Sequence, residues 1–256
     1  MLSRAELKSR AKESVKKYYW AAVLVCFLTT LLSGGIGSSV ASRMNGSDPE
    51  IKQALAQMDT SLLLGIAAVL MTVILVAAVV STLWNIFVGN VITVGACRFF
   101  MESRERQTSA GVGRLFYIFK SGGYLNTVLT VFLRNLFISL WSLLLVVPGI
   151  IKSYQYAMVP YILSENPQMN WREALDLSKK MMDGQKWNLF VLQLSFIGWL
   201  LLGILLCGVG IYFVLPYMNA AEAEFYAELR KNSGMIGKGL PGFGDQPEVP
   251  YAEETL

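Results

Sequence analysis

The sequence predicts an all-α membrane protein, a polytopic bundle of about six transmembrane helices in three hairpins, with amphipathic helices at the membrane surface. Hydrophobic residues make up 54% of the 256-residue chain and charged residues 16%, whereas an ordinary soluble domain carries about 25% charged residues. Several apolar runs reach the roughly 20 residues that a helix needs to cross the hydrocarbon core. Lysines and arginines gather beside these runs, as the positive-inside rule requires.

Three regions follow from this pattern. Residues 1–18 are predicted to form a basic amphipathic helix, because Ser3 and Glu6 have capping-box spacing and the apolar residues of this region share one face. Such a helix is suited to lie on an anionic cytoplasmic leaflet. Residues 19–230 form the predicted membrane domain. Residues 231–256 are rich in glycine, proline and acidic residues and predict a flexible tail.

The expected spans cover residues 21–40, 62–87, 127–147, 150–163, 189–206 and 211–223. The second continues as a protruding helix to Arg98, because 36 apolar residues in one helix exceed the thickness of a bilayer. Residues 98–126 are expected to form a basic loop. The segments at 150–163 and 211–223 are short for full spans, so re-entrant half-helices remain an alternative for both.

A further amphipathic helix is predicted between Asn170, which suits an N-cap, and Gly184, which suits a helix stop. We expect it to lie on the bilayer surface. With six spans and both termini cytoplasmic, Arg43 and Lys52 are the basic residues placed outside. A four-span threading would move residues 148–188 to the outer side with their lysines and arginines, so the positive-inside rule favours six.

A short motif occurs twice in the second half of the chain. Tyr156 to Pro160-Tyr161 recurs as Tyr212 to Pro216-Tyr217, with Trp141 and Trp199 upstream of the two copies. This predicts a parallel repeat of a hairpin. A fainter echo links the segments FFMESR and FYAELR, which begin at residues 99 and 225.

A proline inside a span frees a backbone carbonyl and kinks the helix, which would suit the hinge or cavity of a transporter. The alternative, which we favour, is that two related hairpins simply pack with kinks. Pro148-Gly149 ends a long apolar run and predicts a tight turn, and Lys152 is expected to snorkel to the nearby interface.

Arg134 is expected about two turns inside the third span, where Glu222 or Glu224 could pair with it. Snorkelling to the interface is an equally good interpretation of Arg134. The candidate functional residues are therefore Arg134, Pro148, Gly149, Lys152, Tyr156, Pro160, Tyr161, Tyr212, Pro216, Tyr217 and Glu222.

Composition argues against several kinds of chemistry. The chain has no histidine, which removes histidine-based metal sites and the common nucleophile–histidine pairs. Its three cysteines, Cys26, Cys97 and Cys207, are far apart and show no CxxC spacing. We therefore expect no catalytic residues, no metal, no cofactor and no enzymatic activity, and we see no pattern for nucleic-acid binding.

Two segments carry a family resemblance: FISLWSLLLVVPGIIKSYQYAMVPYILSENP from residue 137 and EALDLSKKMMDGQKWNLFVLQLSFIGW from residue 173. They resemble an uncharacterised integral-membrane family of Gram-positive bacteria, a domain of unknown function, and the likeness extends over residues 7–230. The chain is also distantly similar to the membrane domain of some glycerophosphodiester phosphodiesterases, which is not their catalytic part. The resemblance implies a helical protein of the bacterial plasma membrane and implies no activity.

The expected function is therefore that of a non-enzymatic membrane scaffold or accessory protein, acting through its basic cytoplasmic surface. The alternative is a small-solute or lipid transporter or channel that uses the Pro-Tyr hairpins. The expected partners are membrane lipids, together with either a membrane-protein partner or further copies of the same chain.

Overall fold

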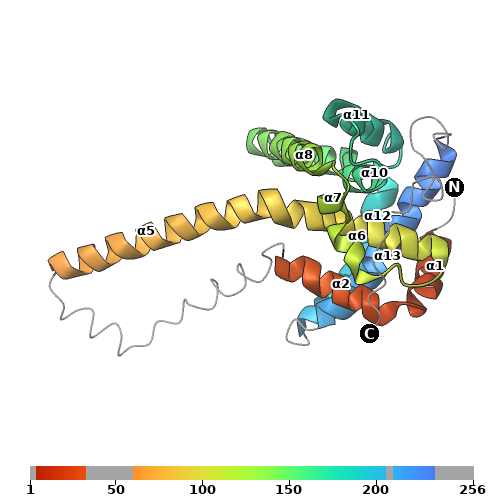
Figure 1. Cartoon of the computed structure of the whole chain (residues 1–256), viewed down its shortest axis with the longest axis horizontal. Helices are drawn as coiled ribbons and strands as arrows, with labels where there is room; N and C mark the ends of the chain where they lie inside the picture. Colours follow the sequence, from red (N-terminus) through yellow and green to blue (C-terminus); the bar gives the residue numbers. More distant parts are fainter. Residues whose placement is uncertain (1–3, 33–59, 206–209, 234–256) are drawn as a thin grey trace.

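The computed structural model describes residues 4–32, 60–205 and 210–233, which form helices joined by turns and short connections (Figure 1). The expectation of an all-α fold is confirmed for these residues. The helices are α1 (Arg4–Lys16), α2 (Tyr19–Leu32), α5 (Thr60–Trp84), α6 (Asn90–Arg106), α7 (Tyr117–Lys120), α8 (Tyr124–Leu144), α9 (Val146–Gln155), α10 (Val159–Glu165), α11 (Trp171–Met181), α12 (Lys186–Leu205) and α13 (Gly210–Asn232).

Three of these helical stretches are long and apolar enough to cross a membrane by length and composition, namely Ala67–Arg106, Tyr124–Leu144 and Lys186–Leu205. They indicate a membrane protein. The first runs through α5, a π-helical turn at Asn85–Gly89 and α6, which confirms that the second expected span continues as a helix to Arg98. Its 40 residues correspond to roughly 60 Å at 1.5 Å per residue.

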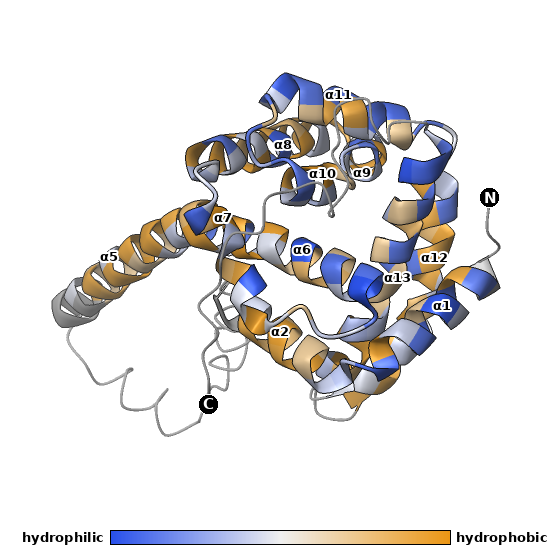
Figure 2. Cartoon of the chain, turned by 45° about the vertical axis from the view of Figure 1, so that its right-hand side comes forward, coloured by the Kyte–Doolittle hydropathy of each residue, from blue (hydrophilic) through white to orange (hydrophobic). Residues whose placement is uncertain are grey.

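Helix α5 projects away from the other helices (Figure 1). All of its side chains from Ala67 to Trp84 are exposed, and Figure 2 shows that they are predominantly hydrophobic. The second half of the long helix, α6, has the opposite character, because it lies at the centre of the helical core. Phe99, Phe100 and Met101 are buried there, where α6 packs against α2, α10 and α13.

The two predicted amphipathic helices exist, but protein covers their apolar faces. In α1, the buried residues Leu7, Ala11 and Val15 belong to the common core, and α13 is the main neighbour of this helix. In α11, Ala174 and Ser178 are fully buried, and α8 and α10 pack on this helix. The prediction that these faces lie on lipid is therefore wrong. Their hydrophilic faces remain on the outside (Figure 2).

The ends of α11 follow the sequence prediction. The Asn170 side chain accepts a hydrogen bond from the Arg172 amide at 3.0 Å, which satisfies one of the unpaired donors of the first turn. At the other end, α11 stops at Met181. Gly184, three residues later, has φ +69°, a left-handed conformation that glycine adopts without strain.

The expected basic loop at 98–126 is in large part ordered structure. Helix α6 continues to Arg106, and a 3₁₀ turn at Val112–Phe116 and the short helix α7 follow. Leu115 and Ile118 are fully buried in the core. Counting the arginines of this region as exposed surface charges led to the wrong prediction.

The predicted hairpin between the third and fourth spans also differs in detail. The chain turns at Leu145, the extended residue between α8 and α9, whereas Pro148 and Gly149 lie in the first turn of α9. Residues 150–163 are no single span, because the chain breaks between α9 and α10. The later part of the first expected span, the loop after it and the tail from residue 234 lie outside the described residues, and six spans are not established.

Candidate functional site at the break between helices α9 and α10

The interruption at Tyr156 has a local cause in the sequence. Proline has no N–H, and its ring collides with the carbonyl four residues earlier. Pro160 therefore cannot continue a helix through Tyr156, and it lies instead in the first turn of α10. The predicted kink is thus a complete break, with Tyr156 to Met158 forming the turn.

Side chains from two neighbouring helices hydrogen-bond to the carbonyls that the break leaves without helical partners. Arg134 of α8 donates from Nε to the Tyr156 carbonyl at 2.8 Å, and that carbonyl also receives a long bond of 3.4 Å from the Val159 amide. Ser178 of α11 donates its hydroxyl to the Gln155 carbonyl at 2.9 Å. A cation at the carbonyl end of a helix is also favoured by the helix dipole. Arg134 therefore joins α8 to the broken end of α9.

Glu222 takes part in a separate chain of hydrogen bonds. Its Oε1 accepts from Gln193 Nε2 at 2.8 Å, and Gln193 Oε1 accepts from the Tyr154 hydroxyl at 3.0 Å. The chain connects α9, α12 and α13. Glu224 forms an ion pair with Arg104 at 2.8 Å. The expectation that Glu222 or Glu224 pairs directly with Arg134 is therefore wrong.

The two groups meet at Cys97 of α6. The side chains of Tyr161, Arg134 and Glu222 all lie close enough to the Cys97 thiol to act on it electrostatically. The structure thus brings three of the candidate residues (Arg134, Tyr161 and Glu222) near one cysteine. The sequence analysis had noted only that this cysteine is far from the other two.

The second Pro-Tyr copy has a different structure. Pro216 lies inside the continuous helix α13, and the carbonyl of Phe213 accepts a hydrogen bond from the Tyr19 hydroxyl of α2 at 3.3 Å. Tyr212 and Tyr217 face aromatic rings of α2, with ring centroids 5.6 Å from Phe27 and from Tyr19 respectively. The second copy therefore binds α2, whereas the first binds α8 and α11.

Two further candidates, Gly149 and Lys152, lie in α9. Gly149 allows α8 and α9 to approach closely, because a Cβ at this position would lie 2.7 Å from the Cα of Ser142. Lys152 places its ammonium 5.3 Å from the ring centroid of Trp141, within the range of a cation–π contact.

Buried ion pairs form another group that the sequence analysis missed. Glu102 contacts Arg98 at 2.7 Å and Arg114 at 2.8 Å, and the Arg98 guanidinium lies 3.6 Å from the centroid of the Tyr117 ring. The i,i+4 spacing of Arg98 and Glu102 on a helix was the available signal.

A second buried carboxylate, Glu165, accepts from Arg230 at 2.8 Å and from the Tyr226 hydroxyl at 2.9 Å. Burial raises the pKa of Glu165 to about 7, although the charge of Arg230 and the bond from Tyr226 act in the opposite direction. The two segments of the faint sequence echo, FFMESR and FYAELR, lie in this region. Their four aromatic residues (Phe99, Phe100, Phe225 and Tyr226) are all buried.

The polar contacts around the break join helices to one another. Within the described part of the chain there is no group of three or more cysteine, aspartate or glutamate side chains placed to hold a metal ion. The arrangement therefore has a clear structural use, since it supplies hydrogen-bond donors to the buried carbonyls that the break at Pro160 leaves without helical partners.

Residues 143–233 match the model of a family described as protein of unknown function (DUF975). The matched part runs from the end of α8 through α13, and it contains the break and both Pro-Tyr motifs but not Arg134. No curated protein and no solved structure matches the chain.

Proposed function

We propose that this chain is a non-enzymatic accessory or scaffold protein of the bacterial plasma membrane, multi-pass with both termini cytoplasmic, which binds another membrane protein through α5. One observation carries this proposal. Helix α5 is a long apolar helix whose side chains are exposed from Ala67 to Trp84, while every other described helix packs against helices other than α5.

An apolar helix without neighbours requires a membrane or a protein around it. A bundle whose helices all pack together leaves only its outer faces for a partner, whereas α5 leaves its whole circumference available. Association in lipid depends on close van der Waals packing between helices, and a lone helix can supply it on any face. The contacts at the break support this proposal, because Arg134 and Ser178 join neighbouring helices there.

The charges of α1 and α11 support a cytoplasmic working surface. Lys179 and Lys180 in the last turn of α11 are exposed, as are Lys12 and Lys16 of α1. Positive charge of this kind marks the cytoplasmic side of membrane proteins. Both helices bury one face in the core, which suits a surface that presents charge to a partner.

Photo-cross-linking in native membranes tests the proposal. A photoreactive amino acid at Val76 of α5, 56% exposed, is compared with the same residue at Leu143 near the end of α8, 86% exposed. We expect one discrete protein adduct from position 76 and none from position 143. Mass spectrometry of the adduct then separates a second copy of this chain from a different protein. Lipid adducts alone at position 76 would overturn the proposal.

The break between α9 and α10 favours a second candidate, a small-solute or lipid transporter. Discontinuous helices with polar side chains at the break are typical of transporter binding sites. Transport predicts that Arg134→Gln abolishes solute or lipid flux in liposomes while the protein level and the α5 adduct stay unchanged. Equal flux through liposomes with and without the wild-type protein would exclude this candidate for the solutes and lipids tested.

A further inference from the structure

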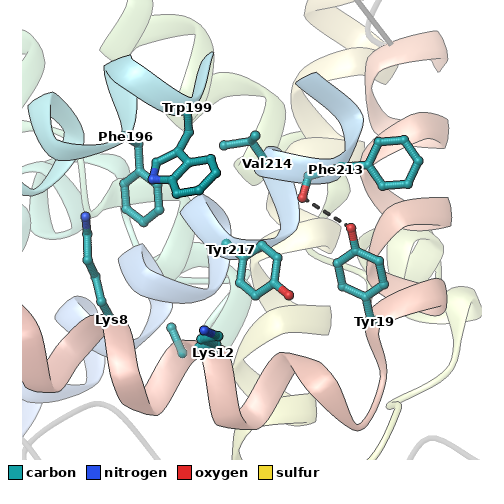
Figure 3. Close-up of a pocket in the computed structure, with 9 residues that line it drawn as sticks. Lys8, Lys12, Tyr19, Phe196, Trp199, Phe213, Val214 and Tyr217 are labelled. Atoms are coloured by element: carbon teal, nitrogen blue, oxygen red, sulfur yellow. Dashed lines mark hydrogen bonds between the residues drawn. The ribbon is translucent and has the colours of Figure 1, made fainter. Parts of the chain in front are cut away.

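A pocket lies between α1, α2, α12 and α13 (Figure 3). Its volume is about 440 Å³, within the range of small-molecule sites. The lining residues are Lys8, Ala11, Lys12, Tyr19, Phe196, Trp199, Phe213, Val214 and Tyr217. The pocket therefore combines one cationic wall, from α1, with an aromatic and apolar wall from the other helices.

The positive charges of this pocket have no acidic counterpart among its lining residues. Lys8 places its ammonium 3.4 Å from the Ser195 carbonyl and 4.4 Å from the centroid of the Phe196 ring. An ammonium has three donors, so a long bond to one carbonyl leaves capacity for an anion. Lys12 is exposed and makes no hydrogen bond or ion pair within the described residues.

Two other basic residues of α1, Arg10 and Lys16, do not share this arrangement. Arg10 lines a separate polar hollow that also contains Glu13, Arg104 and Glu224, so acidic side chains accompany it. Lys16 is exposed and does not line the pocket. Lys8 and Lys12 are therefore distinguished by their position beside aromatic rings and away from carboxylates.

The apolar wall of the pocket indicates that a bound anion would also carry an apolar part. Trp199 belongs to α12, one of the candidate membrane spans, and 60% of its surface is exposed. Tyr19 is fixed beside the pocket by its bond to the Phe213 carbonyl (Figure 3). Tryptophan and tyrosine next to lysine are typical of the membrane–water interface, where a lipid has both its charged headgroup and the upper part of its chains.

We propose that this pocket binds an anionic phospholipid. The phosphate lies between the ammonium groups of Lys8 and Lys12, and the glycerol and first chain segments lie against Trp199, Phe213 and Tyr217. A free phosphate ion shares the charge but makes no use of the aromatic wall. The site is independent of the proposed partner at α5.

Native mass spectrometry of the full-length protein in detergent, titrated with phosphatidylglycerol or with phosphatidylcholine of the same chains, tests this site. We expect tighter binding of phosphatidylglycerol. Lys12→Gln should weaken it about fivefold, since a lysine near an anionic lipid contributes on the order of 1 kcal/mol, a factor of about five. The combined change Lys8→Gln and Lys12→Gln should have a larger effect, and Lys16→Gln should have none.

Two further measurements separate a pocket from general attraction. Val214→Trp fills the pocket and keeps both lysines, so it should reduce phosphatidylglycerol binding, and inorganic phosphate at millimolar concentration should not displace the lipid. Equal losses in Lys12→Gln and Lys16→Gln would show diffuse electrostatics and overturn the proposal. Displacement by inorganic phosphate would overturn it in favour of a free-phosphate site, and equal binding of the two lipids would overturn it outright.

Discussion

Glu165 should make the stability of this protein depend on pH in a specific direction. It lies beyond the end of the apolar segment, its side chain is fully buried, and burial raises its pKa from 4.5 to about 7. In the unfolded chain it ionises near pH 4.5. The folded state therefore holds this proton more tightly, and the stabilisation is fully present below about pH 4.5 and is lost as the pH rises through about 7.

The size of the effect follows from the difference of about 2.5 pKa units, at about 1.36 kcal/mol per unit. Between pH 4.5 and pH 8.5 the group should lower the free energy of unfolding by about 3 kcal/mol. For a chain of this size that is a fall in Tm on the order of 10 °C. Thermal unfolding in detergent, followed by tryptophan fluorescence, measures it.

Glu165→Gln is the matched variant, because glutamine keeps the shape and does not titrate. Its absolute stability will differ from wild type, so the quantity to compare is the slope of Tm against pH. The wild-type Tm should fall with pH relative to that of the variant, mainly between about pH 4.5 and pH 7.5. Parallel curves for the two proteins would refute the assignment of this pH dependence to Glu165.

Three further substitutions test contacts described above. Arg134→Gln should lower the free energy of unfolding by about 2 kcal/mol, because the Tyr156 carbonyl loses its charged donor. Arg134→Lys should lower the free energy of unfolding by less. Urea denaturation of Arg134→Gln that is the same as for the wild type would contradict this role. Asn170→Ala should cost about 1 kcal/mol through the lost N-cap, whereas Asn170→Asp should be nearly neutral in the same assay. Gly149→Val should lower Tm through overpacking against Ser142, at a cost of about 1–3 kcal/mol, while Gly198→Ala, which has open space around it, should not.

Local features of the chain were predictable from the sequence. Asn170 and Gly184 mark the two ends of α11 because a cap and a left-handed glycine act within a few residues. The long helix through α5 and α6 follows from one uninterrupted apolar run. The disruptive effect of Pro160 was also predictable, since it depends on the carbonyl four residues earlier.

Features that depend on distant contacts were not predictable from the sequence. The partner of the Tyr156 carbonyl is Arg134, 22 residues earlier, and no local pattern identifies it. An amphipathic pattern shows that α1 has an apolar face, but it does not distinguish a lipid surface from α13 as the material that covers it. Arg98 and Arg114 were counted as surface charges because sequence alone does not show that both reach Glu102 in the interior.

The structure also decides where the membrane threading can be tested. A single cysteine at Ser178 would be uninformative, because this residue is fully buried with its hydroxyl on the Gln155 carbonyl, and protection there would reflect packing on either side of the membrane. Lys179, the next residue, is exposed. In a background without the three native cysteines, Lys179→Cys should resist an impermeant thiol reagent in intact cells and react after permeabilisation. Reaction in intact cells would place α11 outside and contradict the six-span threading. The permeabilised cells are the control: because permeabilisation removes only the membrane barrier, a cysteine that reacts there but not in intact cells was protected by the membrane.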